Sequence, residues 1–220
     1  MMDDQKIEDT YRTIARPSRA ELTVKASRFI GEAMPVETAD EALEELDTIR
    51  KREHTASHHC FAYRIGSDAV EFRYSDDGEP TGTGGPPILR HIDGRDLTNL
   101  VVVVTRYYGG TNLGTGGLIR AYGDVAATAL DDARVVTKIL REQVSLRFQY
   151  DDTSPAMHTI NQFDAPILDT NYSEDTEVIV NVRRAEAKGL CAMFTSALAG
   201  RGTATRLDIT PDIPGQSVAR

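Results

Sequence analysis

Residues 100–105 read LVVVVT, with four consecutive valines. A continuous β-branched run without polar alternation predicts a central strand that is covered on both faces. The segment TRYYGGTNLGTGG, residues 105–117, follows it, and the amphipathic stretch 118–130 comes next. We interpret this order as a strand, a glycine-rich connection and a helix that packs on the strand.

The residues before this segment predict one helix and one hairpin. TADEALEELDTIRKRE places Thr38 and Glu41 at the spacing of a capping box and carries an apolar face, which predicts a helix. HHCFAYRI and AVEFRY flank GSD, and apolar residues alternate with charged ones in the second run. This pattern predicts a β-hairpin.

The C-terminal part follows a second plan. VSLRFQY alternates, with Val144, Leu146, Phe148 and Tyr150 on one side of a half-buried strand. The residues that follow predict, in order, a helix from Ser154, a strand near residue 167, the turn YSED, the strand TEVIVNV, a helix ending at residue 200 and the strand ATRLDI. The order β-α-β-β-α-β is that of a ferredoxin-like domain. The sequence thus predicts an α+β protein with domains at 1–142 and 143–220, and frayed ends at 1–9 and 211–220.

Composition narrows the class of function. Among 220 residues there are two cysteines, Cys60 and Cys191, without paired spacing, so we expect them to be reduced and buried. The chain shows neither a long apolar run nor a leader-like stretch, which predicts a cytoplasmic protein with no membrane partner. A net charge of -9 argues against indiscriminate binding to phosphate backbones, so an anion site must be local.

The glycine-rich connection is a candidate binding surface, because free N–H groups at a helix start hold anions. Its glycines are Gly109, Gly110, Gly114, Gly116 and Gly117. Arg106 adds a fork of donors for phosphate or carboxylate, and Tyr107 or Tyr108 could stack on a ring. The GK[ST] ending of a P-loop is missing, and Ile119 stands where GxGxxG needs its last glycine. The alternative is that the glycines only allow a tight crossover while the tyrosines pack in the core.

The tetrapeptide GTGG occurs twice. SDDGEPTGTGGPPIL contains it at 82–85, the first GTGG loop, and the glycine-rich connection contains it at 114–117, the second GTGG loop, so we expect the two loops to meet at one edge of the domain. Asp76, Asp77 and Glu79 place three carboxylates beside the first GTGG loop. They could bind a hard cation, transfer protons or pair with Arg106, unless they form a solvated turn.

HTASHHC carries several histidines and Cys60. On a strand His58 and Cys60 point to one side and His59 to the other, and HExxH is absent. His54 could cap a helix end, and the others could form buried hydrogen bonds, with a metal site as the weaker alternative. No nucleophile elbow is present.

The chain resembles the YigZ/IMPACT family in three motifs. They are, in this order, HTASHHCFAYRIG, YSDDGEPTGTGGPPIL and VVVVTRYYGGTNLGTGGLIRAY. The resemblance implies an N-terminal domain like the second domain of small-subunit ribosomal protein five, and a tail like domain five of the translocating elongation factor. It also implies a link to translation control under amino-acid starvation. The family pattern carries over to the loop positions named above and to Gly78. Many bacterial relatives have a cation where this chain has Pro86, so one cation of a phosphate site is missing here.

The leading expectation is a non-enzymatic regulator of translation or stress that uses the Arg106 face, with His54 and His58 nearby, to dock RNA, the ribosome or a partner protein. The alternative is an enzyme or binding protein for a small phosphorylated or carboxylated metabolite. In a third interpretation the glycines are purely architectural. No catalytic residue, cofactor or metal is predicted. Exposure of Arg106 beside Asp76 and Asp77 would make it a binding group, whereas burial in an ion pair would make it a structural fastener.

Overall fold

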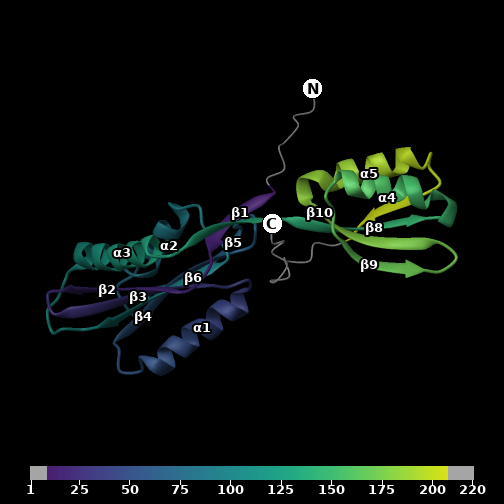
Figure 1. Cartoon of the computed structure of the whole chain (residues 1–220). Helices are drawn as coiled ribbons and strands as arrows, with labels where there is room; N and C mark the ends of the chain where they lie inside the picture. The colour runs from purple at the N-terminus through teal and green to yellow at the C-terminus, as the bar shows by residue number, and fades with distance from the viewer. Residues whose placement is uncertain (1–8, 208–220) are drawn as a thin grey trace. The chain divides into compact units, whose positions relative to one another are not determined.

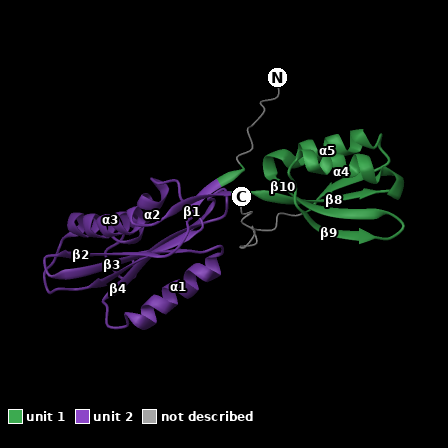
Figure 2. Ribbon diagram, in the orientation of Figure 1, with its two compact units in different colours: residues 1–10, 139–220 green, residues 11–138 purple. Residues whose placement is uncertain are grey.

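The computed structural model describes residues 9–207 and divides into two compact units. One unit is Tyr11–Lys138, and the other comprises, among the described residues, 9–10 and 139–207 (Figure 2). The frayed ends expected from the sequence lie outside the described residues, apart from residue 9.

The unit Tyr11–Lys138 is built on a five-stranded sheet in the order β2-β3-β6-β4-β5, with every neighbouring pair antiparallel. The strands of this sheet are β2 (Ser18–Val24), β3 (Ser27–Pro35), β4 (His58–Ile65), β5 (Glu71–Ser75) and β6 (Leu100–Tyr107). The helices are α1 (Ala39–Arg52), α2 (Gly85–Asp93) and α3 (Thr115–Asp131). Two further strands, β1 (Thr10–Ile14) and β7 (Val135–Ile139), pair with each other.

The predicted strand LVVVVT is the centre of this sheet, and helices cover both of its faces (Figure 1). Val102 and Val104 belong to the core formed with α2 and α3, whereas Val101 and Val103 belong to the core formed with α1. All four valines have exposed fractions of 0%. The prediction of a strand covered on both faces is confirmed, and the covering explains why the run has no polar alternation.

The other local predictions for this unit also hold. The Thr38 side chain accepts a hydrogen bond from the N–H of Glu41 at the start of α1. β4 and β5 form the predicted antiparallel hairpin. Strands β1 to β3 and β7 are additional to the elements predicted from the sequence.

The second unit contains a four-stranded antiparallel sheet in the order β11-β8-β10-β9, with α4 and α5 packed on its hydrophobic core. Its elements are β8 (Arg141–Phe148), α4 (Thr153–Gln162), β9 (Ile167–Tyr172), β10 (Thr176–Arg183), α5 (Arg184–Ala197) and β11 (Thr203–Arg206). The element order β-α-β-β-α-β is the predicted one. The predicted alternation is wrong at Tyr150, because this residue lies beyond β8 in a 3-10 turn and is 83% exposed. Residues 208 and 209 of the predicted last strand lie outside the described chain.

Candidate functional site

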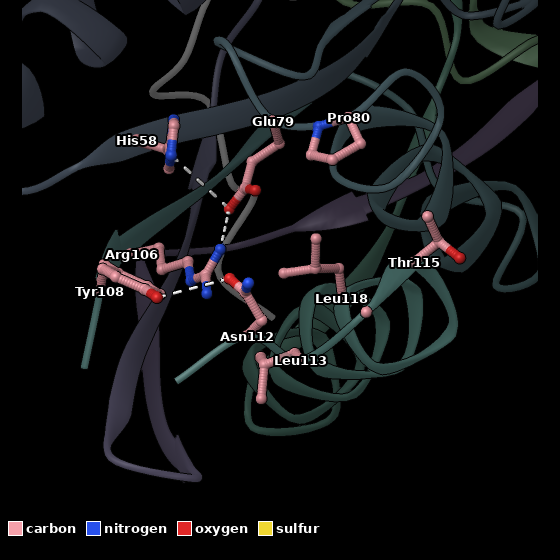
Figure 3. Close-up of a pocket in the computed structure, with 10 residues that line it drawn as sticks. His58, Glu79, Pro80, Arg106, Tyr108, Asn112, Leu113, Thr115 and Leu118 are labelled. Atoms are coloured by element: carbon pink, nitrogen blue, oxygen red, sulfur yellow. Dashed lines mark hydrogen bonds and ion pairs between the residues drawn. The ribbon is translucent and has the colours of Figure 1, made fainter. Parts of the chain in front are cut away.

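A pocket of about 490 Å³ lies in the unit Tyr11–Lys138 where β4 and β6 approach the start of α3 (Figure 3). Its lining residues are His58, Glu79, Pro80, Arg106, Tyr108, Asn112, Leu113, Gly114, Thr115 and Leu118. The pocket therefore joins the two glycine-rich loops, as the repeated GTGG predicted.

Strand register sets one wall of this pocket. His58 on β4 lies directly opposite Arg106 on β6, and Phe29 on β3 lies opposite Arg106 on its other side. Directly opposed residues project to the same face of a sheet, so these three side chains share the face that α2 and α3 cover. The Arg106 guanidinium lies 5.4 Å from the ring centre of Phe29 and 5.4 Å from that of Tyr108. Arg106 thus makes cation–π contacts with two aromatic rings.

Arg106 is buried, with an exposed fraction of 4%, and it forms an ion pair. Its Nη1 donates to Oε1 of Glu79 at 2.5 Å, and the Tyr122 hydroxyl donates to the same oxygen at 2.7 Å. The partner is Glu79 rather than either aspartate. Burial in an ion pair was expected to mark a structural role, so through Nη1 Arg106 connects β6 to the acidic loop.

Asp76 occupies the start of α2. Its Oδ1 accepts hydrogen bonds from the N–H groups of Gly84 and Gly85 at 2.8 and 2.9 Å, and its Oδ2 accepts one from Gly82 at 2.8 Å. These donors are the free N–H groups that a helix start and its loop leave over. The first GTGG loop is therefore filled by a carboxylate of the chain itself, and Asp76 does not line the pocket.

Asp77 is also used within the fold. Its carboxylate pairs with Arg50 at 2.7 Å and accepts the His59 N–H at 2.7 Å. Its backbone carbonyl lies 2.8 Å from Nδ1 of His58. Because a carbonyl can only accept, this contact places the proton of a neutral His58 on Nδ1 and leaves Nε2, 3.9 Å from Oε1 of Glu79, as the acceptor nitrogen.

The start of α3 differs from the start of α2. Gly114, the N-cap, has φ 73°, and no described side chain caps this end of the helix. A Cβ added at Gly116 would have no heavy atom within 4 Å among the described neighbours. The second GTGG loop thus leaves its helix start open beside the pocket.

Comparison with known proteins supports the family resemblance that the quoted motifs indicated. Residues 25–130 match the family model described as the Impact N-terminal domain. The chain is 32% identical to IMPACT family member YvyE of Bacillus subtilis over 201 residues, which is 91% of this chain and 93% of the relative. The chain belongs to the IMPACT family. It is also 33% identical to IMPACT family member YigZ of Escherichia coli over 178 residues, 80% of this chain and 85% of that one.

A solved structure, described as the crystal structure of a hypothetical protein, resembles this IMPACT-family chain with a TM-score of 0.67 at 29% identity. The likeness covers 93% of this chain and 99% of the other. The mixed α/β fold with antiparallel sheets is therefore shared with a solved protein.

The structure brings together only some of the residues that the sequence singled out in this IMPACT-family chain. Those that line the pocket are His58, Glu79, Arg106, Tyr108 and Gly114. Those that do not line it are His54, Asp76, Asp77, Gly78, Tyr107, Gly109, Gly110, Gly116 and Gly117.

Three of the residues outside the pocket have another place in the fold. The Tyr107 hydroxyl donates to Glu53 at 2.7 Å and thereby lowers the pKa of that carboxyl. Gly109 lies against the backbone of Ala26, and His54 is exposed in the turn after α1. Tyr107 and Gly109 thus connect parts of the fold.

Sequence reasoning missed half of the lining. The missed residues are Pro80, Asn112, Leu113, Thr115 and Leu118. Four of them lie inside the quoted loops, and treating each loop as one surface would have found them. Leu118 follows Gly114 by one helical turn, a spacing that places both on one side of α3.

The pocket's neighbours do not include an activated thiol. Cys60 donates from Sγ to the carbonyl of Asp76 at 3.0 Å, and burial raises the pKa of this thiol to about 12. A thiol with that pKa is not a nucleophile at neutral pH. Within residues 9–207 no three His, Cys, Asp or Glu side chains are grouped as metal ligands, and no helix has the length and apolarity of a membrane span. The pocket offers groups for recognition: a partly paired guanidinium, an imidazole nitrogen and an uncapped helix start.

Proposed function

We propose that this IMPACT-family protein is a non-catalytic regulator associated with translation or the stress response, and that it binds a ribosomal or ribosome-associated protein through the surface around the pocket. The observation that carries the proposal is the meeting of both glycine-rich family motifs at this one pocket. The link to translation comes from the family resemblance.

The structure favours a protein partner over an RNA backbone. Arg106 is buried and paired with Glu79, so its Nη1 donor is not free for a phosphate. The net charge of -9 also opposes binding to a polyanion, which depends mainly on electrostatic attraction. The exposed rim instead presents Tyr108, which is 48% exposed, and aromatic residues are enriched where proteins bind each other.

The proposal includes the finer domain description. We keep two domains, 1–142 and 143–220, the first like the second domain of small-subunit ribosomal protein five and the second ferredoxin-like, as in the translocating elongation factor. The strand order β11-β8-β10-β9 with α4 and α5 on one core supports the ferredoxin-like description. A cytoplasmic location is part of the same proposal.

Sedimentation with purified ribosomes tests this function. We expect the full chain to pellet with ribosomes, and purified ribosomal RNA not to compete. Tyr108→Ala should weaken pelleting by roughly tenfold or more, the effect of losing an interface hot spot. Tyr74→Ala is the matched control, since Tyr74 is a similarly exposed tyrosine, at 46%, outside the pocket. Wild-type protein that stays in the supernatant, or that ribosomal RNA displaces, contradicts the proposal.

A further inference from the structure

We infer that the pocket binds a small molecule whose anionic headgroup, a carboxylate or a phosphate monoester, lies at the start of α3 and whose apolar body packs on Tyr108, Leu113 and Leu118. This inference rests on the proposed function, because it assigns a ligand class to the same binding surface. The argument starts from the repeated tetrapeptide.

In the first GTGG loop the backbone N–H groups of the repeat bind a carboxylate. Its first glycine, Gly82, has φ 80°, and the loop's N–H groups surround the Asp76 carboxylate at 2.8 to 2.9 Å. The second loop also begins with a left-handed glycine, Gly114 at φ 73°. The two helices start at different points of the repeat, α2 at its last glycine and α3 at its threonine. In both loops, however, the repeat delivers N–H groups to a helix start.

The second loop has no such carboxylate from its own chain. No described side chain caps α3, which is 17 residues long, so its first N–H groups and the positive end of its dipole face outward. Gly114 and Thr115 line the pocket. Anions bind readily at helix starts of this kind.

Arg106 supplies an independent indication of a ligand. It lines the pocket, it is 4% exposed, and its Nε has no hydrogen-bond partner among the described residues. Its Nη2 makes one contact of 3.4 Å, to Ser27 Oγ. An unpaired buried donor costs free energy, and a ligand acceptor that reaches it removes this cost.

The charge of Glu79 does not close the pocket to anions. Its Oε1 accepts from Arg106 and from the Tyr122 hydroxyl, so the carboxylate is already paired with a cation and a donor. Figure 3 shows the Arg106 guanidinium between Glu79 and Asn112. The polar groups around the pocket are thus the Arg106–Glu79 ion pair, whose charges cancel, the imidazole of His58 and the positive end of the α3 dipole.

The remaining lining suits an apolar body. Tyr108, Leu113, Leu118 and Pro80 contribute ring and aliphatic surface to the pocket. Its volume of about 490 Å³ falls within the range of small-molecule sites, about 300–1,000 Å³. Such sites combine apolar walls with a few polar groups that orient the ligand.

An amide-resolved NMR titration tests the inference on the isolated full chain. The probes are phenyl phosphate, phenylacetate and the neutral phenylacetamide, each raised to about 10 mM, a range that detects weak binding. We expect saturable shifts of the Thr115, Gly116 and Gly117 amides with at least one anionic probe, and the tighter anion identifies the headgroup. Equal binding of phenylacetamide, shifts confined to other residues, or no shifts with either anion overturns the inference.

Gly116→Asp provides the sharper variant. A side chain at residue 116 has open space, and a carboxylate in the first turn of α3 is compatible with the helix dipole, so the variant should fold. It places a negative charge in the first turn of α3, next to Thr115, which lines the pocket at the expected headgroup position. Anion affinity should fall roughly tenfold or more, while the isosteric neutral control Gly116→Asn should keep it. Equal affinity of the two variants overturns the inference.

This titration contains no ribosomes, so its result is separable from the proposed function. Probe binding without ribosome pelleting contradicts only the proposed binding to a ribosomal or ribosome-associated protein. Pelleting without probe binding overturns only the anion inference.

Discussion

Nη1 of Arg106 lies 2.5 Å from Oε1 of Glu79, and the two side chains are only 5% and 4% exposed. Removing water from two charges is costly, and their attraction offsets that cost only while both remain. This ion pair joins the central strand β6 to the acidic loop and so holds one wall of the pocket in place.

Arg106→Met should destabilise the protein strongly, because it leaves the buried Glu79 carboxylate without its cation. Breaking a buried ion pair in this way costs about 3–5 kcal/mol. Urea unfolding measures the loss, and Arg106→Met combined with Glu79→Gln should recover part of it. Arg28→Ala is the control: Arg28 pairs with Glu21, and both side chains are nearly half exposed, so water screens the pair and its loss should destabilise the protein much less than Arg106→Met. Equal effects of the two arginine substitutions would contradict the structural role of the buried pair.

The glycines of the connection should respond differently to alanine. A Cβ at Gly109 would lie 2.1 Å from the backbone of Ala26, so Gly109→Ala must displace the β2–β3 turn. Gly114→Ala should cost about 1–3 kcal/mol, because φ 73° with ψ 164° is a backbone conformation that essentially only glycine adopts. Gly116→Ala has open space within α3 and should stabilise by about 0.4–1 kcal/mol. Thermal melts of the three variants check this order, and a uniform loss would instead favour the view that all the glycines are architectural.

Asp76→Ala should loosen the start of α2, since three backbone N–H groups lose their acceptor. Loss of a helix cap costs about 0.5–2 kcal/mol, and we expect the upper end here. Hydrogen exchange of the Gly82, Gly84 and Gly85 amides should accelerate. Asp68→Ala, in the exposed turn between β4 and β5, should change stability by less than about 0.5 kcal/mol. Unchanged exchange in Asp76→Ala would show that the carboxylate does not hold the loop.

Acidification should destabilise the fold through His59. Burial of this imidazole lowers its pKa below the ordinary histidine value of about 6.5. Below about pH 6.5 the unfolded chain therefore binds a proton that the folded chain resists, so the free energy of unfolding falls as the pH drops towards the folded pKa. Urea unfolding at about pH 7.5 and about pH 5.5 should show a smaller pH-dependent loss in His59→Gln than in wild type. An identical loss in both proteins would rule out this contribution.

Local sequence patterns predicted most individual elements correctly. The Thr38–Glu41 box, the valine run of β6 and the alternation of Val144, Leu146 and Phe148 act through neighbours in the chain or through one buried face. Tyr150 continued the alternating pattern but is exposed, because the strand ends two residues earlier and a 3-10 turn follows. Element boundaries depend on tertiary packing more than on pattern.

The roles of the site residues depended on register, which the sequence does not display. Neighbouring Tyr107 and Tyr108 were equal candidates for stacking, yet Tyr107 hydrogen-bonds to Glu53 and Tyr108 lines the pocket. Three carboxylates likewise looked alike in the acidic loop. In the fold Asp76 binds the start of α2, Asp77 pairs with Arg50, and Glu79 pairs with Arg106.

The sequence by itself determined the family, the central strand, the β-α-β-β-α-β order of the C-terminal part and the association of the two glycine-rich loops, because each follows from local composition and spacing. Only the tertiary structure decided that Asp76 fills one GTGG loop while the start of α3 stays open. It also decided that Arg106 is buried against Glu79. Both outcomes depend on which distant side chains reach the same few donors, and long-range packing sets those distances.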